Sequence, residues 1–93
     1  MLFMIAAYLK PGIERQLLDF RNELNEHFAQ DALAVAGALH DQAGDRKGYL
    51  GFVEGDSFED AERFVRQGPF YQEQLYERIE IFRYELEVGH IGA

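Results

Sequence analysis

Residues 2–9 read LFMIAAYL and are followed at once by Lys10-Pro11-Gly12, and this stretch decides the architecture of the chain. An apolar run of eight residues bounded by a Pro-Gly pair is typical of a strand buried on both faces. From Pro11 the period changes, because apolar residues then recur every three or four positions as far as Phe28. This spacing predicts an amphipathic helix of about 18 residues directly after the strand.

Two further strand-like segments follow the helix. Residues 32–39 (ALAVAGAL) and 47–54 (KGYLGFVE) have strand character, and residues 40–46 between them are typical of a hairpin loop. Gly48 and Gly51 do not form a phosphate loop, because no Gly-Lys-Ser/Thr follows them. Their position inside a strand indicates a close approach of backbone or space for a ligand.

The last third of the chain predicts a second helix and a final strand. Ser57 is a suitable N-cap with Asp60 at the capping-box position, and the predicted buried stripe consists of Phe58, Ala61, Phe64 and Val65. Gly68-Pro69 ends this helix. Residues 70–76 leave room for a short helical turn, and residues 78–88 (RIEIFRYELEV) alternate as a strand.

The order of these elements is β-α-β-β-α-β. Because strand-helix-strand crossovers are right-handed, two such units sharing one sheet give a ferredoxin-like α+β fold, with a four-stranded antiparallel sheet and both helices on one face. We expect one domain over residues 1–93, with a mobile tail at residues 89–93.

Two helices cover only one face of such a sheet, yet the strands are apolar on both. In the last strand Ile79 and Ile81 point one way, and the residues that point the other way are Phe82, Tyr84, Leu86 and Val88. If this face were exposed to water, its apolar area would exceed the few hundred Å² that soluble monomers usually tolerate. We therefore expect a homodimer with the two sheets packed face to face, forming a dimeric α/β barrel. The alternative is that edge positions or the C-terminal tail account for these residues.

Charge and composition exclude several partners. The 9 Lys and Arg against 17 Asp and Glu give a net charge of −8, which repels nucleic-acid phosphates and anionic membranes. The absence of cysteine excludes thiolate chemistry and favours the cytoplasm. The three histidines, at positions 27, 40 and 90, lack the close pairing of metal ligands, so we predict neither a metal nor a cofactor.

The stretch from Gly37 to Tyr71 resembles the YCII-related (YciI-like) domain family. The shared pattern is a strand end, a short Asp/Gly loop, a Gly-x-hydrophobic strand, a Ser-x-Glu-x-Ala-like helix and then a Pro-aromatic pair, here Pro69-Phe70. The resemblance implies a dimeric α/β barrel whose cleft holds a helix histidine, matched by His27, and an Asp before the proline. Here that Asp is Gly68. A relative in the family acts as a dehydrochlorinase on an aromatic substrate.

His27 is therefore the candidate catalytic residue, as a general base that lacks the carboxylate which normally orients it. A histidine at the end of a helix also has a purely structural explanation, because the helix dipole favours it there. The candidate ligand-binding residues are His40, Asp41, Tyr49, Pro69 and Phe70. For these, turn polarity and core filling are the alternatives.

Two functions follow from these residues. The first is a dimeric barrel that binds a small aromatic molecule in a cleft, with His-assisted proton transfer or elimination of the lyase or isomerase type. The second is a non-catalytic ligand-binding or accessory module that has lost the His/Asp pair of the family.

Overall fold

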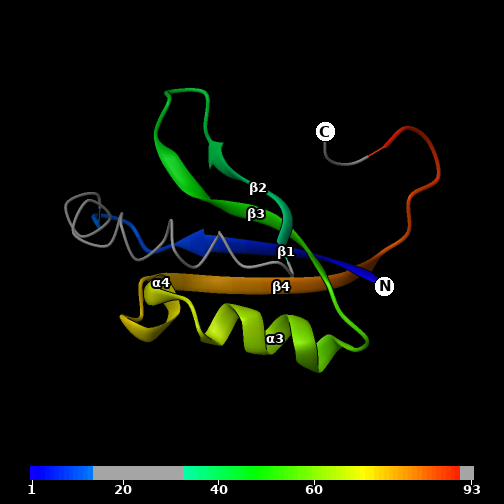
Figure 1. Ribbon diagram of the computed structural model, residues 1–93. Helices are drawn as coiled ribbons and strands as arrows, with labels where there is room; N and C mark the ends of the chain where they lie inside the picture. Colours follow the sequence, from blue (N-terminus) through cyan, green and yellow to red (C-terminus); the bar gives the residue numbers. More distant parts are fainter. Residues whose placement is uncertain (14–32, 91–93) are drawn as a thin grey trace.

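The computed structural model describes residues 1–13 and 33–90, which contain four strands and two helices (Figure 1). The elements are β1 (Leu2–Leu9), β2 (Leu33–His40), β3 (Arg46–Glu54), α3 (Phe58–Arg66), α4 (Pro69–Gln72) and β4 (Tyr76–Tyr84). The bounds predicted for the first strand are those observed, and those of the second and third strands differ by one residue. The predicted first helix lies, after Ile13, outside the described residues, and so does His27.

All strand pairs are antiparallel, and the order in the sheet is β2-β3-β1-β4. This is the order of a ferredoxin-like sheet, with β1 and β3 inside and β2 and β4 at the edges. Helix α3 runs along one face of it (Figure 1). The final strand was predicted over residues 78–88 but spans Tyr76–Tyr84. The reason is pairing, because Tyr84 is the last residue that faces β1, opposite Leu2.

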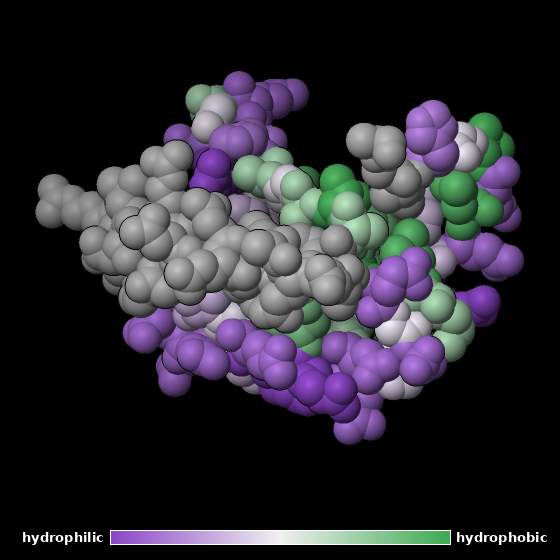
Figure 2. Space-filling model, viewed as in Figure 1, coloured by the Kyte–Doolittle hydropathy of each residue, from purple (hydrophilic) through white to green (hydrophobic). Residues whose placement is uncertain are grey.

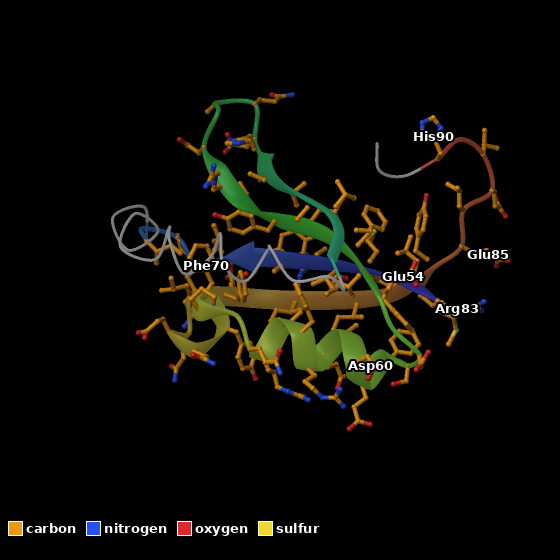
Figure 3. All side chains as sticks on the ribbon, viewed as in Figure 1. Glu54, Asp60, Phe70, Arg83, Glu85 and His90 are labelled. Carbon is orange, nitrogen blue, oxygen red and sulfur yellow. The ribbon has the colours of Figure 1, made fainter. Side chains whose placement is uncertain are left out.

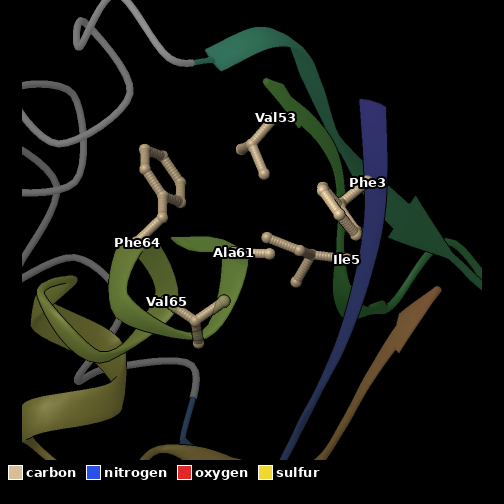
Figure 4. Close-up of a cluster of buried hydrophobic side chains, with 6 residues drawn as sticks. All are labelled: Phe3, Ile5, Val53, Ala61, Phe64 and Val65. Carbon is tan, nitrogen blue, oxygen red and sulfur yellow. The ribbon is translucent and has the colours of Figure 1, made fainter. Parts of the chain in front are cut away.

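The face of the sheet that carries α3 is closed by the first of two apolar clusters (Figure 4). Its members are Phe3, Ile5, Val53, Ala61, Phe64 and Val65, with exposed fractions from 0 to 8%. Three of the four residues predicted for the buried stripe of α3 are therefore confirmed. Phe58 is 48% exposed, so its prediction as buried was wrong. It lies in the first turn, where its ring meets the Phe3 ring edge to face, with centroids 5.0 Å apart.

The second apolar cluster lies toward α4 on the same side of the sheet. It consists of Leu9, Ile13, Tyr49, Phe70 and Leu75, with Tyr76 packed against it. Phe70 is 1% exposed, so the short helix α4 is attached to the sheet by a fully buried ring. This attachment fixes the segment that follows α3 at the end of the sheet where β1 stops.

The other face of the sheet carries the alternate residues of each strand. The register places Met4 of β1 between Phe52 of β3 and Phe82 of β4, with Leu2, Leu50 and Tyr84 as their neighbours. We call these six residues the open face. The Phe52 and Tyr84 rings meet edge to face at 4.9 Å, and Phe82 is 51% exposed. None of the described helices packs on this face.

The C-terminal tail does not bury its own apolar side chains. Residues 85–90 are all exposed, with Leu86 at 44% and Val88 at 90%. In Figure 2 hydrophobic residues lie toward the upper right, interspersed with hydrophilic ones, whereas the lower surface along α3 is hydrophilic. Of the open face, Phe82 is exposed and the other five residues are half-buried, so coverage of part of this face by the tail stays an alternative.

Gly48 marks a close approach between the two central strands, as its place inside a strand predicted. It pairs with Tyr8 of β1, and a Cβ atom on Gly48 would overlap the carbonyl oxygen of Ala7. That atom would also lie 3.2 Å from the Tyr8 Cα. Only glycine fits between these backbones.

Candidate functional site

Three segments converge at the end of the sheet where β1 stops. Leu9 pairs with Tyr76 at the start of β4, and the Lys10 N–H donates to the Leu75 carbonyl at 2.9 Å. Arg46 begins β3 at the same end. Figure 3 places Phe70 here, whereas Glu54, Arg83 and His90 lie at or beyond the opposite end. We call this region the α4 end.

A row of aromatic rings forms the floor of the α4 end. Tyr49 and Phe70 lie 5.4 Å apart between centroids, and Phe70 and Tyr76 lie 6.1 Å apart. Arg46 donates from Nη1 to the Tyr49 hydroxyl at 3.0 Å, with its guanidinium 5.5 Å from the Tyr49 ring centre. Of the predicted ligand-binding residues, Tyr49 and Phe70 are thus in contact, and Pro69 begins α4 beside them. The rings of Tyr49 and Phe70 are buried, with exposed fractions of 8% and 1%.

Two recesses open at this end. The larger, about 530 Å³, is the α4 recess, and the smaller, about 180 Å³, is the Pro11 recess. Lys10 lines both of them. The other residues of the α4 recess are Arg66, Tyr71, Gln72, Gln74, Tyr76 and Ile79. The other residues of the Pro11 recess are Leu9, Pro11, Ile13, Arg46, Lys47 and Glu77. The larger volume is in the range of small-molecule sites.

The α4 recess offers several kinds of contact to a ligand. Tyr71 is 41% exposed and Ile79 is half-buried. Burial raises the pKa of the Tyr76 phenol, and the nearby Tyr49 adds to the rise. Tyr76 therefore keeps its proton at neutral pH and is available as a hydrogen-bond donor.

The predicted pair His40 and Asp41 lies in the β2–β3 hairpin, and both residues are exposed. The His40 Nδ1 lies 3.2 Å from the Gly44 carbonyl oxygen, and Asp41 Oδ1 accepts from the Asp45 N–H at 3.0 Å. The Asp45 N–H and the charge of Lys47, 3.6 Å away, hold the pKa of the Asp41 carboxyl below its usual value. These contacts organise the turn, and a ligand role for either residue stays a prediction.

Gly68 occupies the position where the resembled family has Asp. It is buried, and its backbone is extended, with φ −76° and ψ 150°. The Gly68 N–H donates to the Val65 carbonyl at 3.0 Å, and its carbonyl accepts from the Gln72 N–H at 3.2 Å. These angles suit any L-residue, so glycine is not required here by its backbone conformation.

The residues that line the α4 recess were not found from the sequence. They come from the end of β1, the end of α3, helix α4 and the start of β4, so no regular spacing connects them. The one local signal was Lys10 itself, at the boundary of the first strand. Within residues 1–13 and 33–90, no group of three or more His, Cys, Asp or Glu side chains is placed to hold a metal ion. No helix in this described part is long and apolar enough to cross a membrane.

Neither a family model nor a curated protein matches the sequence. Solved structures do match. A dehydrochlorinase of 5-chloro-2-hydroxyhydroquinone, TftG from Burkholderia phenoliruptrix in complex with 2,5-dihydroxybenzoquinone, aligns with a TM-score of 0.80. The alignment covers 91% of this chain and 94% of TftG at 21% identity.

Two more distant matches have the same overall arrangement. SnoaB, a cofactor-independent oxygenase from Streptomyces nogalater, covers 96% of each chain with a TM-score of 0.58 and 10% identity. Rv0793 from Mycobacterium tuberculosis has a TM-score of 0.58 and 12% identity, over 95% of this chain and 97% of its own. At these identities the likeness concerns the fold, and the chain is similar to all three in having a ferredoxin-like α+β structure.

Proposed function

We propose that the protein binds a small, flat, aromatic molecule in the α4 recess. The observation that carries this proposal is the recess of about 530 Å³ whose described lining combines tyrosine rings, amides and cations beside the buried Phe70. A mostly preformed hollow with a few converging polar groups is the usual form of a small-molecule site. The dehydrochlorinase TftG, with a similar fold, is solved with a ring compound, 2,5-dihydroxybenzoquinone.

The chemistry that we propose is proton transfer or elimination assisted by His27, in a YCII-like cytoplasmic protein. An imidazole titrates near neutral pH and is a suitable general base once a neighbour orients it. The resemblance to the family supplies this role, and the family's orienting carboxylate is replaced by Gly68. That replacement favours a second candidate, a binding module without turnover.

The protein acts in this proposal as a homodimer through the open face. Phe82 of this face is 51% exposed, whereas Ile79 and Ile81 on the other face of the same strand pack against the core. Exposure of apolar surface to water is unfavourable by roughly 25 cal/mol for each Å². Burial of this surface against a second copy of the chain would recover that free energy. Ion-paired residues flank the face, as with Arg78 and Glu80 at 3.5 Å.

The binding proposal is tested with 2,5-dihydroxybenzoquinone as the probe in an NMR titration of the labelled protein. We expect the backbone signals of Tyr71, Gln72 and Gln74 to shift, and Tyr71→Ala to weaken binding at least about fivefold by removing a ring contact. Tyr84→Phe, on the open face, is the matched control and should bind as the wild type does. Shifts confined to the open face would refute the recess as the site.

The dimer is tested with Phe82→Asp, which would bury an unpaired charge between two sheets and should give monomers or unfolded protein. Arg83→Asp places the same side chain at the next position of β4, on the opposite face, and should leave the mass unchanged. Sedimentation at micromolar concentration measures both variants. A folded wild-type monomer, or a Phe82→Asp dimer, would contradict the proposed interface.

A further inference from the structure

The charges around the α4 recess run against those of the chain as a whole. The protein has a net charge of −8, yet the described residues that line this recess include Lys10 and Arg66 and no carboxylate. The smaller Pro11 recess, which shares Lys10, has Arg46 and Lys47 against the single lining acid Glu77, although Lys47 also pairs with Asp41 outside the recess at 3.6 Å. A local excess of positive charge on an acidic protein attracts anions into the recess.

Lys10 is the cation best placed to use this field. No carboxylate of the described residues forms an ion pair with its ammonium, whereas the Arg66 guanidinium already pairs with Glu62 at 3.6 Å. The backbone of Lys10 is held at the end of β1 by its hydrogen bond to Leu75. A lysine on a fixed backbone beside protonated Tyr76 gives an ammonium and a phenol donor that line one recess.

Gln74 adds a second observation at the rim of the recess. Its φ is 59°, and it is the one non-glycine residue of the described part with a positive φ. This left-handed conformation costs a non-glycine residue about 1 kcal/mol, and glycine would adopt it freely. Gln74 nevertheless lines the recess, and a glutamine amide offers both a donor and an acceptor.

From these observations we propose that the ligand of the α4 recess is an aromatic anion, whose carboxylate or phenolate oxygen pairs with the Lys10 ammonium. The ring of the ligand lies against Tyr71 and Ile79, and its remaining polar group meets Gln74 or the Tyr76 hydroxyl. This inference rests on the proposed function, because it requires a small molecule in this recess, and it goes further in assigning the charge of that molecule and the residue that recognises it.

The test compares benzoate with benzamide, two probes of nearly the same shape that differ in charge. NMR titrations of the wild type, Lys10→Met and Arg63→Met give the dissociation constants. We expect the wild type to bind benzoate at least about tenfold more tightly than benzamide, and Lys10→Met to lose this preference through a weaker affinity for benzoate. Arg63→Met is the matched control, since Arg63 pairs with Glu59 and Asp60 and does not line the recess.

A second variant addresses the rim residue. Gln74→Gly should fold at least as stably as the wild type, because it relieves the left-handed conformation, and should still weaken benzoate binding about two- to fivefold. Equal affinity for the two probes, or equal effects of Lys10→Met and Arg63→Met, would overturn the anion inference and leave the binding proposal standing. If neither these probes nor 2,5-dihydroxybenzoquinone shifted the signals of the recess, both would fail.

Discussion

The close approach at Gly48 leads to a sharp prediction about stability. Gly48→Ala places a Cβ against the Ala7 carbonyl oxygen and 3.2 Å from the Tyr8 Cα, and neither backbone atom can rotate away. The clash is relieved only if β1 and β3 separate locally, which weakens the hydrogen bonds on either side of the pair. Two weakened bonds and the disturbed packing amount to about 2–4 kcal/mol, and for a chain of this size the melting temperature should fall by roughly 10–30 °C.

Gly37→Ala is the matched control for this prediction. Gly37 lies in the neighbouring strand β2, and a Cβ there meets no atom within 4 Å. Alanine is preferred to glycine inside a strand by about 0.5–1 kcal/mol, so this variant should melt at or above the wild-type temperature. Both variants are measured by circular dichroism and urea unfolding at one protein concentration, because a dimer's stability depends on concentration. A Gly48→Ala protein that melted within about 2 °C of the wild type would show that the two strands are not held as closely as described.

Two further changes test local electrostatics and the candidate catalytic residue. The Asp56 N–H donates to Asp60 Oδ2 at 2.7 Å, and this bond, helped by Arg63, lowers the pKa of Asp60 from 3.8. The bond therefore stabilises the fold above that pH and is lost on acidification, so Asp60→Asn should be destabilised at pH 7 by an amount that shrinks as the pH is lowered below 3.8. A difference that stays constant with pH would argue against this origin. Gly68→Asp should fold, because its backbone is already extended, and should raise the His27 pKa in an NMR titration if the two positions communicate. An unchanged His27 pKa in the folded variant would remove the family's His/Asp pair from consideration.

Much of the fold was predictable because it depends on patterns that are local in sequence. The first strand was correct to the residue, since an apolar run followed by Pro11-Gly12 leaves little choice. The final strand was displaced because alternation alone does not say where a partner strand ends, and pairing with β1 stops at Tyr84. Phe58 was misassigned because a helical stripe does not reveal that the first turn of α3 overhangs the core.

The candidate site was less predictable because it is assembled from side chains far apart in sequence. Pro69 and Phe70 were identified through the family resemblance, and Phe70 does anchor the α4 end. Lys10, Arg66 and Tyr76 line one recess because β1, α3 and β4 each have a terminus at the same end of the sheet. Their spacing in the sequence does not predict this proximity. Residues of this kind become visible only once the strand order is known.

The central position of β1 has a consequence for how the protein is made. Its two partner strands, β3 and β4, lie far downstream in the sequence, and Leu2 can pair with Tyr84 only after residue 84 has been synthesised. At translation rates of about 5–20 residues per second, this apolar strand stays unpaired for several seconds. A β-prone segment without charge is prone to association with other nascent chains during that interval. The synthesis of β4 therefore sets how soon β1 is fully paired, and slow synthesis or truncation before residue 76 should increase demand for chaperones.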